Sequence, residues 1–423
     1  MSAPTLTTAH TDLPTTGTDG TPRTTPTNPA TTADPHPLHP TADFYGLFAD
    51  LPEADREAWA RARALADDAL PAVNDAWEHA DYRLDLVRRM GDLDLLTDGV
   101  PTPGSAPLSP LAAGLINMEV ARIDGSLATV IAVQGGLTMR TLQLLGSAEQ
   151  QAAWLVPLAR AEKLGAFGLT EPLHGSDAVG LETSAVRDGD DWVLNGQKRW
   201  IGNGSVGDMT IIWARNEEGK VNGFIVSQDT PGYVAEAITG KVSLRGIPQA
   251  LITLTDVRVP EAARLPGARS FRDVSRVLMA TRAGIAWAAL GHAIACYEAA
   301  VAHAEIRVQF GKPLASYQLI QDRLATMLGS LVTMQLHCRR IAELDAAGRL
   351  RPEQASMAKV QCTRLARTVA ADARDLLGGS GILLENHVIR HLADLEALHT
   401  YEGTDSVQSL IVGRSITGIG AFA

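Results

Sequence analysis

The sequence contains little cysteine, and the cysteines it has are not spaced for chemistry. Cys296, Cys338 and Cys362 are the three cysteines in 423 residues, and each falls in a segment with a helical pattern of apolar residues. The sequence has no CxxC pair and no Cys/His cluster, so it offers neither a disulfide framework nor a metal site. We expect three small buried apolar side chains, a reducing compartment and no bound metal.

The sequence also lacks an excess of basic residues. Lys and Arg number 37 against 48 Asp and Glu, which gives a formal net charge of -11. Nucleic acids and anionic membrane surfaces are polyanions, so this balance disfavours both as general partners. It leaves room for a local basic pocket that binds a phosphorylated small molecule.

The sequence also lacks targeting and membrane-spanning signals. We find no apolar run that is long and clean enough to span a bilayer. The first residues show neither the charged-then-apolar pattern of a secretory signal nor the Arg-rich amphipathic pattern of a transit peptide. We therefore expect a cytoplasmic protein that does not enter a membrane.

Composition divides the chain into four parts. Residues 1–42 are mostly Thr, Pro, Ala, Asp and Gly, which cannot bury a core, so we expect a disordered tail. Residues 43–165 and 271–423 have helical patterns, and residues 166–270 have short β-type runs between turn residues. The predicted class is α+β, with an N-terminal α-helical domain, a central antiparallel β-domain and a C-terminal helical bundle.

Local signals predict where the helices begin and end. Pro52 stands near the start of the first helix. A pattern that follows Ser270 reads as one long helix, which the glycine and proline of Gly311-Lys312-Pro313 end. Residues 404–406 are typical helix starters, and Gly418 can close the helix that follows them.

Two further local patterns are specific enough to test. Ser147 is followed three residues later by Gln150, which is a capping-box arrangement. The pairs Asn195-Gly196 and Asn222-Gly223 are typical of hairpin turns between strands.

Four stretches concentrate groups that can bind a planar or phosphorylated ligand. AFGLTEPLHGSD, residues 166–177, offers hydroxyls and a flexible glycine, although ordinary turns use the same residues. NGQKRWIGNG sets Trp200 beside glycines, so this tryptophan is either core or a wall for a flat cofactor. RVQFGKPLASYQLIQ places Arg307 at a helix break, where an isolated arginine is normally a surface charge. DLLGGSG, residues 375–381, is an ordinary helix end whose N–H groups can also meet a phosphate.

Together with TYEGT, residues 400–404, these motifs resemble the acyl-CoA dehydrogenase family in sequence and in order. TYEGT followed by LIVGRSITGI is most similar to the glutaryl-CoA dehydrogenase branch. WIGN and LPGARSFRDVSRVL also resemble short-chain acyl-CoA oxidases. The resemblance covers nearly everything after about residue 43 and implies the family fold, which ends in a four-helix bundle.

The resemblance implies FAD as cofactor. It implies that one subunit binds the flavin ring and that Arg307 and Gln318 reach the FAD of a neighbouring subunit, so the protein is a homodimer or homotetramer. The implied FAD-binding residues are Phe167, Leu169, Thr170, Ser176, Trp200, Ile201, Gly202, Arg307, Gln318, Gly378, Gly379 and Thr404.

Glu402 matches the catalytic base of the family, although a lone glutamate before a helix is ordinarily a solvated loop residue. A proton α to a thioester carbonyl is a poor acid, so hydrogen bonds from the Glu402 N–H and the FAD ribityl chain must stabilise the enolate. An acyl chain that expels water raises the pKa of the carboxylate and makes it a stronger base. Ser176, Arg282 and Gly403 are the implied substrate contacts. Some relatives place the base immediately before the arginine, where this chain has Thr281, which cannot serve.

Two departures from the family bear on the substrate and the electron acceptor. Glutaryl-CoA dehydrogenases hold the distal carboxylate with an Arg-Ser pair, and the matching residues here are Ala128 and Thr129. A methyl group cannot neutralise a buried carboxylate, so we expect a short or branched apolar acyl chain. Gly202 stands where dehydrogenases commonly have threonine, which points towards access for dioxygen.

We therefore predict α,β-dehydrogenation of an acyl-CoA to the trans-2-enoyl thioester, in fatty acid metabolism. The acyl carrier is CoA or a carrier protein, and the electron acceptor is electron-transfer flavoprotein or O2. Three alternatives stay open: an acyl-CoA oxidase, a flavin monooxygenase on the same fold, and a catalytically silent thioester-binding protein.

Overall fold

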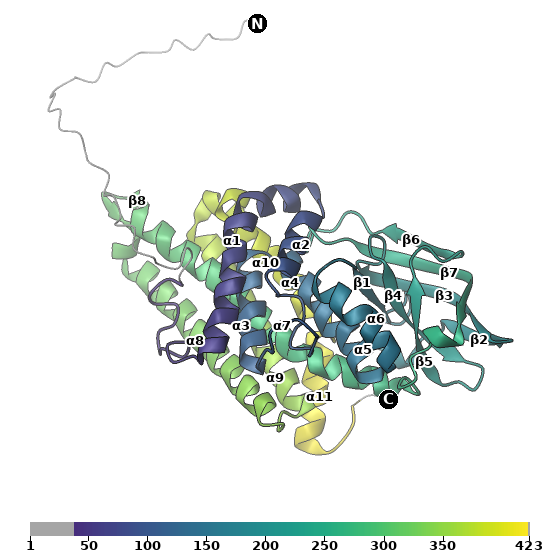
Figure 1. Cartoon of the computed structure of the whole chain (residues 1–423). Helices are drawn as coiled ribbons and strands as arrows, with labels where there is room; N and C mark the ends of the chain where they lie inside the picture. The colour runs from purple at the N-terminus through teal and green to yellow at the C-terminus, as the bar shows by residue number, and fades with distance from the viewer. Residues whose placement is uncertain (1–37, 422–423) are drawn as a thin grey trace, which may run out of the picture. The chain divides into compact units, whose positions relative to one another are not determined.

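Helices form the first part of the described chain, which runs from residue 38 to residue 421 in this computed structural model (Figure 1). The helices are α1 (Glu53–His79), α2 (Leu84–Asp92), α3 (Pro110–Ile123), α4 (Gly125–Ile131), the π-helix η1 (Ala132–Met139), α5 (Arg140–Leu145) and α6 (Ala148–Ala159). Pro52 directly precedes α1, and the predicted capping box of Ser147 and Gln150 begins α6. The tail predicted over residues 1–42 lies outside the described residues except at 38–42.

The middle of the chain forms one mixed sheet. Its strands are β1 (Gly165–Gly168), β2 (Ser184–Asp188), β3 (Asp191–Gly202), β4 (Met209–Asn216), β5 (Val221–Ser227), β6 (Tyr233–Ala237) and β7 (Gln249–Pro260). The strand order is β1-β4-β2-β3-β7-β6, and β5 pairs with β4. The central β-domain is therefore confirmed, but β4 pairs in parallel with both β1 and β2, so the sheet is not wholly antiparallel.

The two predicted Asn-Gly turns are wrong. Asn195-Gly196 lies inside β3 at a register shift, and Asn222-Gly223 lies inside β5. Tertiary packing explains both glycines, because a Cβ at Gly196 would lie 2.6 Å from Thr183 Oγ1 and one at Gly223 would lie 2.9 Å from Leu265 Cδ1. The chain instead reverses at Gly189 and Gly219, which both have positive φ.

The last part of the chain is a bundle of long helices, as predicted: α7 (Phe271–Ile306), α8 (Gln318–Ala346), α9 (Pro352–Leu376), α10 (Val388–Thr400) and α11 (Asp405–Thr417). α7 ends at Ile306, earlier than predicted, because a short hairpin of β8 (Val308–Gln309) and β9 (Lys312–Pro313) follows it. The predicted ends of α11 are confirmed. The Thr404 hydroxyl accepts the N–H of Val407, and Gly418 closes the helix at φ 72°.

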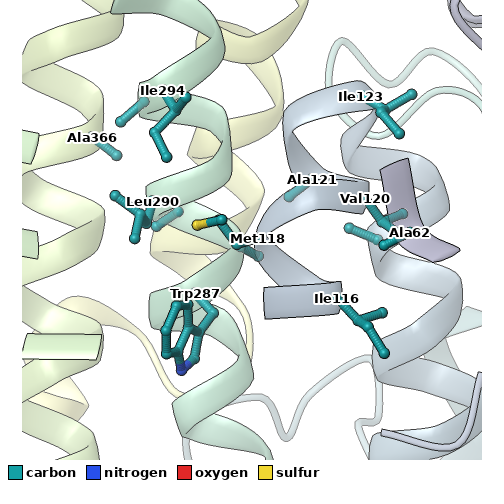
Figure 2. Packing of buried hydrophobic residues seen from close by; sticks show 14 of the residues in the cluster. Ala62, Ile116, Met118, Val120, Ala121, Ile123, Trp287, Leu290, Ile294 and Ala366 are labelled. Atoms are coloured by element: carbon teal, nitrogen blue, oxygen red, sulfur yellow. The ribbon is translucent and has the colours of Figure 1, made fainter. Parts of the chain in front are cut away.

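Close packing of α3 against α7 joins the N-terminal helices to the bundle. Figure 2 shows Met118 of α3 beside Leu290 of α7, with Trp287 and Ile294 along the same face of α7. The three cysteines are buried and free, as predicted. The contact leaves no space for a side chain at Gly291, where a Cβ would lie 2.0 Å from the carbonyl oxygen of Met118.

α7 corrects one expectation drawn from the sequence. By length and composition it is apolar enough to cross a membrane, and such a segment was not expected. However, 78% of its most apolar window is buried inside the protein. α7 is therefore read as the core helix of the bundle.

Replacing Gly291 with Ala should lower the free energy of unfolding by about 2 kcal/mol or more, because the new methyl group forces α3 and α7 apart. Gly329→Ala is the matched control. Gly329 lies within α8, and a methyl group added there would have no neighbouring atom within 4 Å. This change should therefore raise the free energy of unfolding by about 0.5–1 kcal/mol. Thermal and urea unfolding measure both values. Equal stability of the two variants would contradict the packing described for Gly291.

Candidate active site

A strained turn between α10 and α11 carries Glu402. Its φ is 57° and that of Gly403 is 86°, and both values lie in the left-handed region. Such a conformation costs about 1 kcal/mol or more for a residue with a side chain. Only glycine fits at 403, because a Cβ there would lie 2.3 Å from Gln408 Nε2. The turn therefore persists because surrounding groups hold it.

Two buried side chains hold the carbonyl groups of this turn. Lys359 Nζ, from α9, donates to the carbonyl oxygens of Tyr401 and Gly403, the latter at 2.5 Å. Gln408 Nε2, from α11, donates to the carbonyl oxygen of Glu402 at 2.6 Å. Within residues 38–421 no acceptor lies on the N–H of Glu402. The turn thus directs three consecutive carbonyls into the protein and leaves this N–H available.

The Glu402 carboxylate meets one side-chain hydrogen-bond donor in the described part of the chain. Thr281 Oγ1, on α7, donates to Glu402 Oε2 at 2.5 Å. Burial raises the pKa of Glu402, while the Thr281 hydrogen bond and the charges of Lys359 and Arg282 oppose the rise without cancelling it. The result is a carboxylate that binds a proton more tightly than an exposed one, as a general base requires.

An internal slot begins beside this carboxylate. We define the slot by two helix faces. One face comes from α4 and η1 and the other from α7, and Tyr401 and Leu398 lie between them. The lining residues are Gly125, Ala128, Ala132 and Gly136 on the first face, and Thr281, Gly284, Ile285, Ala288 and His292 on the second. Asp98 and Asn117 also line it.

The two faces run in opposite directions along the slot. A Cβ on Gly136 would lie 3.4 Å from Thr281 Cγ2, and one on Gly125 would lie 2.8 Å from the ring of His292. Glu402 therefore stands at the Thr281 end, and His292 stands at the far end. Between these ends the lining residues are mostly glycine, alanine and isoleucine, so the walls of the slot are largely apolar there.

The structure brings the two predicted flavin motifs together. Arg199 N donates to the carbonyl oxygen of Thr170 at 2.8 Å. The buried ammonium of Lys198 bonds to the carbonyl oxygen of Leu169 at 3.1 Å and to Glu171 Oε1 at 2.8 Å. These contacts fix the backbone after β1 against the end of β3, which is a prerequisite for one shared site.

The groups on these motifs suit a flat, polar cofactor. Phe167, Leu169 and Ile201 are buried, whereas the Trp200 side chain is 52% exposed at φ 66° and is not part of the core. Ser176 is exposed and Thr170 is half-buried. Neither hydroxyl has a hydrogen-bond partner within residues 38–421. An open aromatic surface beside free hydroxyls fits an isoalloxazine ring and a pyrophosphate.

η1 lies between these strands and the slot. Gly165 N donates to Gln134 Oε1 of η1 at 2.8 Å. A Cβ at Gly202 would lie 2.9 Å from Val133 Cγ2, so glycine at 202 has a packing reason. η1 therefore contacts the strands that carry the flavin motifs through Val133 and Gln134, and it borders the slot through Ala132 and Gly136.

The remaining predicted cofactor residues lie elsewhere. Arg307 follows α7, Gln318 begins α8, and Gly378 and Gly379 follow α9; all four are exposed. Arg323 and Asp375 form an ion pair that places the start of α8 beside the end of α9. Thr281 and Ile306 are 25 positions apart in α7, or about 38 Å of helix. A single chain does not bring these four residues to Glu402.

The other predicted contacts are placed close to Glu402. Arg282 follows Thr281 and donates from Nη1 to Ser356 Oγ at 3.2 Å, and Gly403 and Thr404 continue the turn. Sequence reasoning missed Lys359 and Gln408, and it treated Thr281 only as a failed base. A detectable signal existed for Lys359, because helical spacing places it on the apolar face of α9 with Ala355, Cys362 and Ala366.

Replacing Lys359 with Met should loosen the turn around Glu402, because two carbonyl acceptors lose their donor. We expect amide hydrogen exchange in residues 398–410 to rise about tenfold or more, with the other bundle helices unchanged. Lys220→Met, in an exposed turn, is the control and should change nothing there. Unaltered exchange in residues 398–410 of the Lys359 variant would show that the turn holds itself.

Comparison with known proteins identifies the family. Three family models match in order: "Acyl-CoA dehydrogenase, N-terminal domain" over residues 52–162, "Acyl-CoA dehydrogenase, middle domain" over 166–257 and "Acyl-CoA dehydrogenase, C-terminal domain" over 271–417. Probable acyl-CoA dehydrogenase YngJ of Bacillus subtilis is 35% identical over 80% of this chain and 92% of its own. The human mitochondrial short-chain specific acyl-CoA dehydrogenase is 34% identical over 77% of this chain and 81% of its own.

Solved structures agree with these matches. Glutaryl-CoA dehydrogenase from Mycobacterium smegmatis superposes with a TM-score of 0.88 at 40% identity, covering 90% of this chain and 99% of that one. Butyryl-CoA dehydrogenase from Megasphaera elsdenii gives a TM-score of 0.82 at 28% identity, covering 87% and 99%. A structure of a glutaryl-CoA dehydrogenase from the same organism contains FADH2. The predicted fold and FAD as the cofactor of the family are confirmed, and the chain belongs to the acyl-CoA dehydrogenases, oxidoreductases that act on CH–CH bonds.

Proposed function

We propose that this chain removes hydrogen from Cα and Cβ of a short or branched acyl thioester and forms the trans-2-enoyl thioester, with Glu402 as the base. The observation that carries this proposal is the position of Glu402. Its half-buried carboxylate bonds to Thr281, which lines one end of the slot, and it stands on a turn that the rest of the bundle holds.

Proton removal needs a strong base in a place without water. Burial raises the pKa of Glu402, so the ionised carboxylate is a stronger base than it would be in solvent. The Thr281 hydroxyl orients one carboxylate oxygen and leaves the other to meet the α-proton. An acyl chain that fills the slot excludes water and strengthens this effect.

The enolate oxygen needs a hydrogen-bond donor. The N–H of Glu402 is suited to this task, since its own carbonyl and those beside it are bound by Lys359 and Gln408. A preorganised backbone donor aimed at a developing oxyanion is worth about 2.7–4 kcal/mol in other enzymes. Arg282, which bonds to Ser356 beside this turn, is proposed to meet the CoA portion.

The FAD site proposed for one chain consists of the strands beside η1. Phe167, Leu169, Thr170, Ser176 and Trp200 supply backbone groups, hydroxyls and an aromatic surface there, and Ile201, Gly202 and Thr404 complete the set. FAD, when bound, supplies the acceptor for the β-hydride. The protein contributes orientation, polarisation and the base.

We also propose a homodimer or homotetramer in which Arg307, Gln318, Gly378 and Gly379 reach the FAD of a neighbouring subunit. About 38 Å of α7 separates Thr281 from the residue before Arg307, so one chain cannot use both groups at one flavin. The same end of the bundle exposes Ile306, Leu319 and Phe310, the last with 96% of its surface. Exposed apolar side chains of this kind favour a protein contact.

The lining of the slot around Ala128 favours an acyl group that has no charge at its end. None of the described residues that line the slot is cationic, so a glutaryl carboxylate would have no cationic partner there. We therefore propose that glutaryl-CoA is a poor substrate, although glutaryl-CoA dehydrogenases are among the solved relatives of this chain. The carrier is proposed to be CoA, with a carrier-protein thioester as the alternative.

We propose electron-transfer flavoprotein as the electron acceptor and a cytoplasmic role in fatty acid metabolism. Glycine at position 202 favours access for O2 by sequence, but in the structure Val133 occupies the space beside that glycine. Retention of the Glu402 carboxylate beside a largely apolar slot disfavours a flavin monooxygenase, because such an enzyme has no α-proton to remove.

Replacing Glu402 with Gln should abolish reduction of the flavin by butyryl-CoA under anaerobic conditions, at least ~1,000-fold in rate, and leave FAD bound. Glu396→Gln is the control. Glu396 is an exposed glutamate on α10 that pairs with Arg367 of α9, and the flavin of this variant should be reduced at the normal rate. Absorbance at the flavin band follows both reactions. Normal bleaching by the Glu402 variant would refute its assignment as the base.

Replacing Thr281 with Val should move the acidic limb of the rate profile to higher pH. The Thr281 hydroxyl donates to the ionised carboxylate and lowers its pKa, so removing it raises the pKa further. The base must be ionised, and activity is therefore lost at a higher pH than in the natural protein. Thr281→Ser keeps the hydroxyl and should keep the natural profile. If the acidic limbs of the Thr281→Val and Thr281→Ser variants fell at the same pH, this role for Thr281 would be excluded.

A further inference from the structure

The end of the slot that lies away from Glu402 is polar. His292 is fully buried on α7 and lines the slot. Its Nδ1 is bonded to His391 Nδ1 at 2.7 Å, and its Nε2 has no partner within residues 38–421. A histidine that only joined two helices would have no need to line a cavity with its second nitrogen.

A second unsatisfied group lies at the same point. Asp394 is fully buried, and its Oδ1 accepts from Trp77 Nε1 and from Leu244 N, but its Oδ2 has no partner within the described chain. The position of a Cβ on Gly125 would be 2.8 Å from this Oδ2 and 3.0 Å from His292 Nε2. Because Gly125 lacks that atom, both polar atoms border the space that this glycine leaves open.

These groups present hydrogen-bonding capacity without a free positive charge. Burial lowers the pKa of His292 to about 3, and it lowers the pKa of His391 well below its usual value, so both rings are neutral. The nearby Arg390 is engaged, since it donates to Asp124 Oδ2 at 2.7 Å and to the carbonyl oxygen of Ile123 at 3.0 Å. Lys241, whose charge acts on Asp394, is likewise bonded to the carbonyl oxygens of Leu244 and Ile247. A carboxylate at this point would therefore meet Asp394, while these two cations of the described chain are already bonded.

The helix sets the distance between the two ends. Thr281 and His292 are eleven positions apart in α7, which corresponds to about 16 Å at about 1.5 Å per residue. Side chains of α7 lean towards its N-terminus, and the longer histidine leans further, which shortens the gap between the reacting groups. A polar atom that reaches His292 must therefore lie several carbons beyond the thioester.

We propose that the slot takes an acyl thioester whose chain ends in a neutral oxygen group, such as a hydroxyl, that hydrogen-bonds to His292 at the end remote from Glu402. This inference rests on the proposed function and refines its substrate: the chain is apolar along its middle and polar at its end. An unsubstituted chain of the same length would exclude water from His292 Nε2 and give it no hydrogen-bond partner. Sites built to bind a hydroxyl discriminate strongly against analogues that lack it.

The test compares matched acyl-CoAs with the FAD-loaded full-length protein. The pairs are hexanoyl-CoA with 6-hydroxyhexanoyl-CoA and octanoyl-CoA with 8-hydroxyoctanoyl-CoA, and the readout is kcat/KM for anaerobic flavin reduction. We expect the hydroxylated member of at least one pair to be preferred by about tenfold or more. Equal rates within both pairs, or preference for the alkyl members, would overturn the inference.

Two variants locate the preference. His292→Leu should reduce the ratio of hydroxylated to alkyl rates to about one, because it removes the imidazole that bonds to the hydroxyl. Ala288→Leu, one helical turn earlier, should have the same effect because the larger side chain blocks the way to His292. His337→Leu, on α8, is the matched control and should keep the ratio. A ratio that survives in both slot variants would place recognition of the hydroxyl elsewhere and overturn the inference.

The outcomes separate this inference from the proposed function. If butyryl-CoA and the alkyl acyl-CoAs reduce the flavin without any benefit from a hydroxyl, the proposed function stands and the inference fails. If no acyl-CoA reduces the flavin of a folded, FAD-loaded protein, the proposed function itself fails and the inference falls with it.

Discussion

The hydrogen bond between Thr281 and the half-buried carboxylate of Glu402 is the contact on which the rest of the site depends. A buried carboxylate is a strong base only where water is excluded, and it is useful only where its position is fixed. Three helices meet these needs together. α7 supplies the hydroxyl, α9 supplies Lys359, and α11 supplies Gln408, and the latter two hold a backbone conformation that is unfavourable for glutamate.

The length of α7 connects the local chemistry to the architecture. One face of this helix holds the base, forms a wall of the slot and ends the slot at His292, and its C-terminal end lies among exposed apolar residues. Close packing against α3 at Gly291 keeps this part of the helix buried and fixed in position. The same burial explains why so apolar a helix belongs to a bundle core rather than to a membrane.

Much of the fold followed from the sequence because its signals are local. Thr404, Gly418 and the Ser147–Gln150 capping box begin or end helices through contacts within a few residues, and all are confirmed. The turn predicted at Asn195-Gly196 was wrong because glycine is needed there to make room for Thr183, which precedes the neighbouring strand β2. The site divided in the same way. Glu402 stood out by its motif, whereas Lys359, His292 and the role of Thr281 depend on which helices pack together, and spacing alone does not specify that.

The most direct test of the account is a structure of the FAD-loaded protein with an acyl-CoA that cannot be oxidised. The account predicts a Glu402 carboxylate oxygen within about 3.5 Å of the α-carbon, the thioester oxygen on the Glu402 N–H and the acyl chain in the slot. A carboxylate directed away from the α-carbon, with the chain outside the slot, would contradict it.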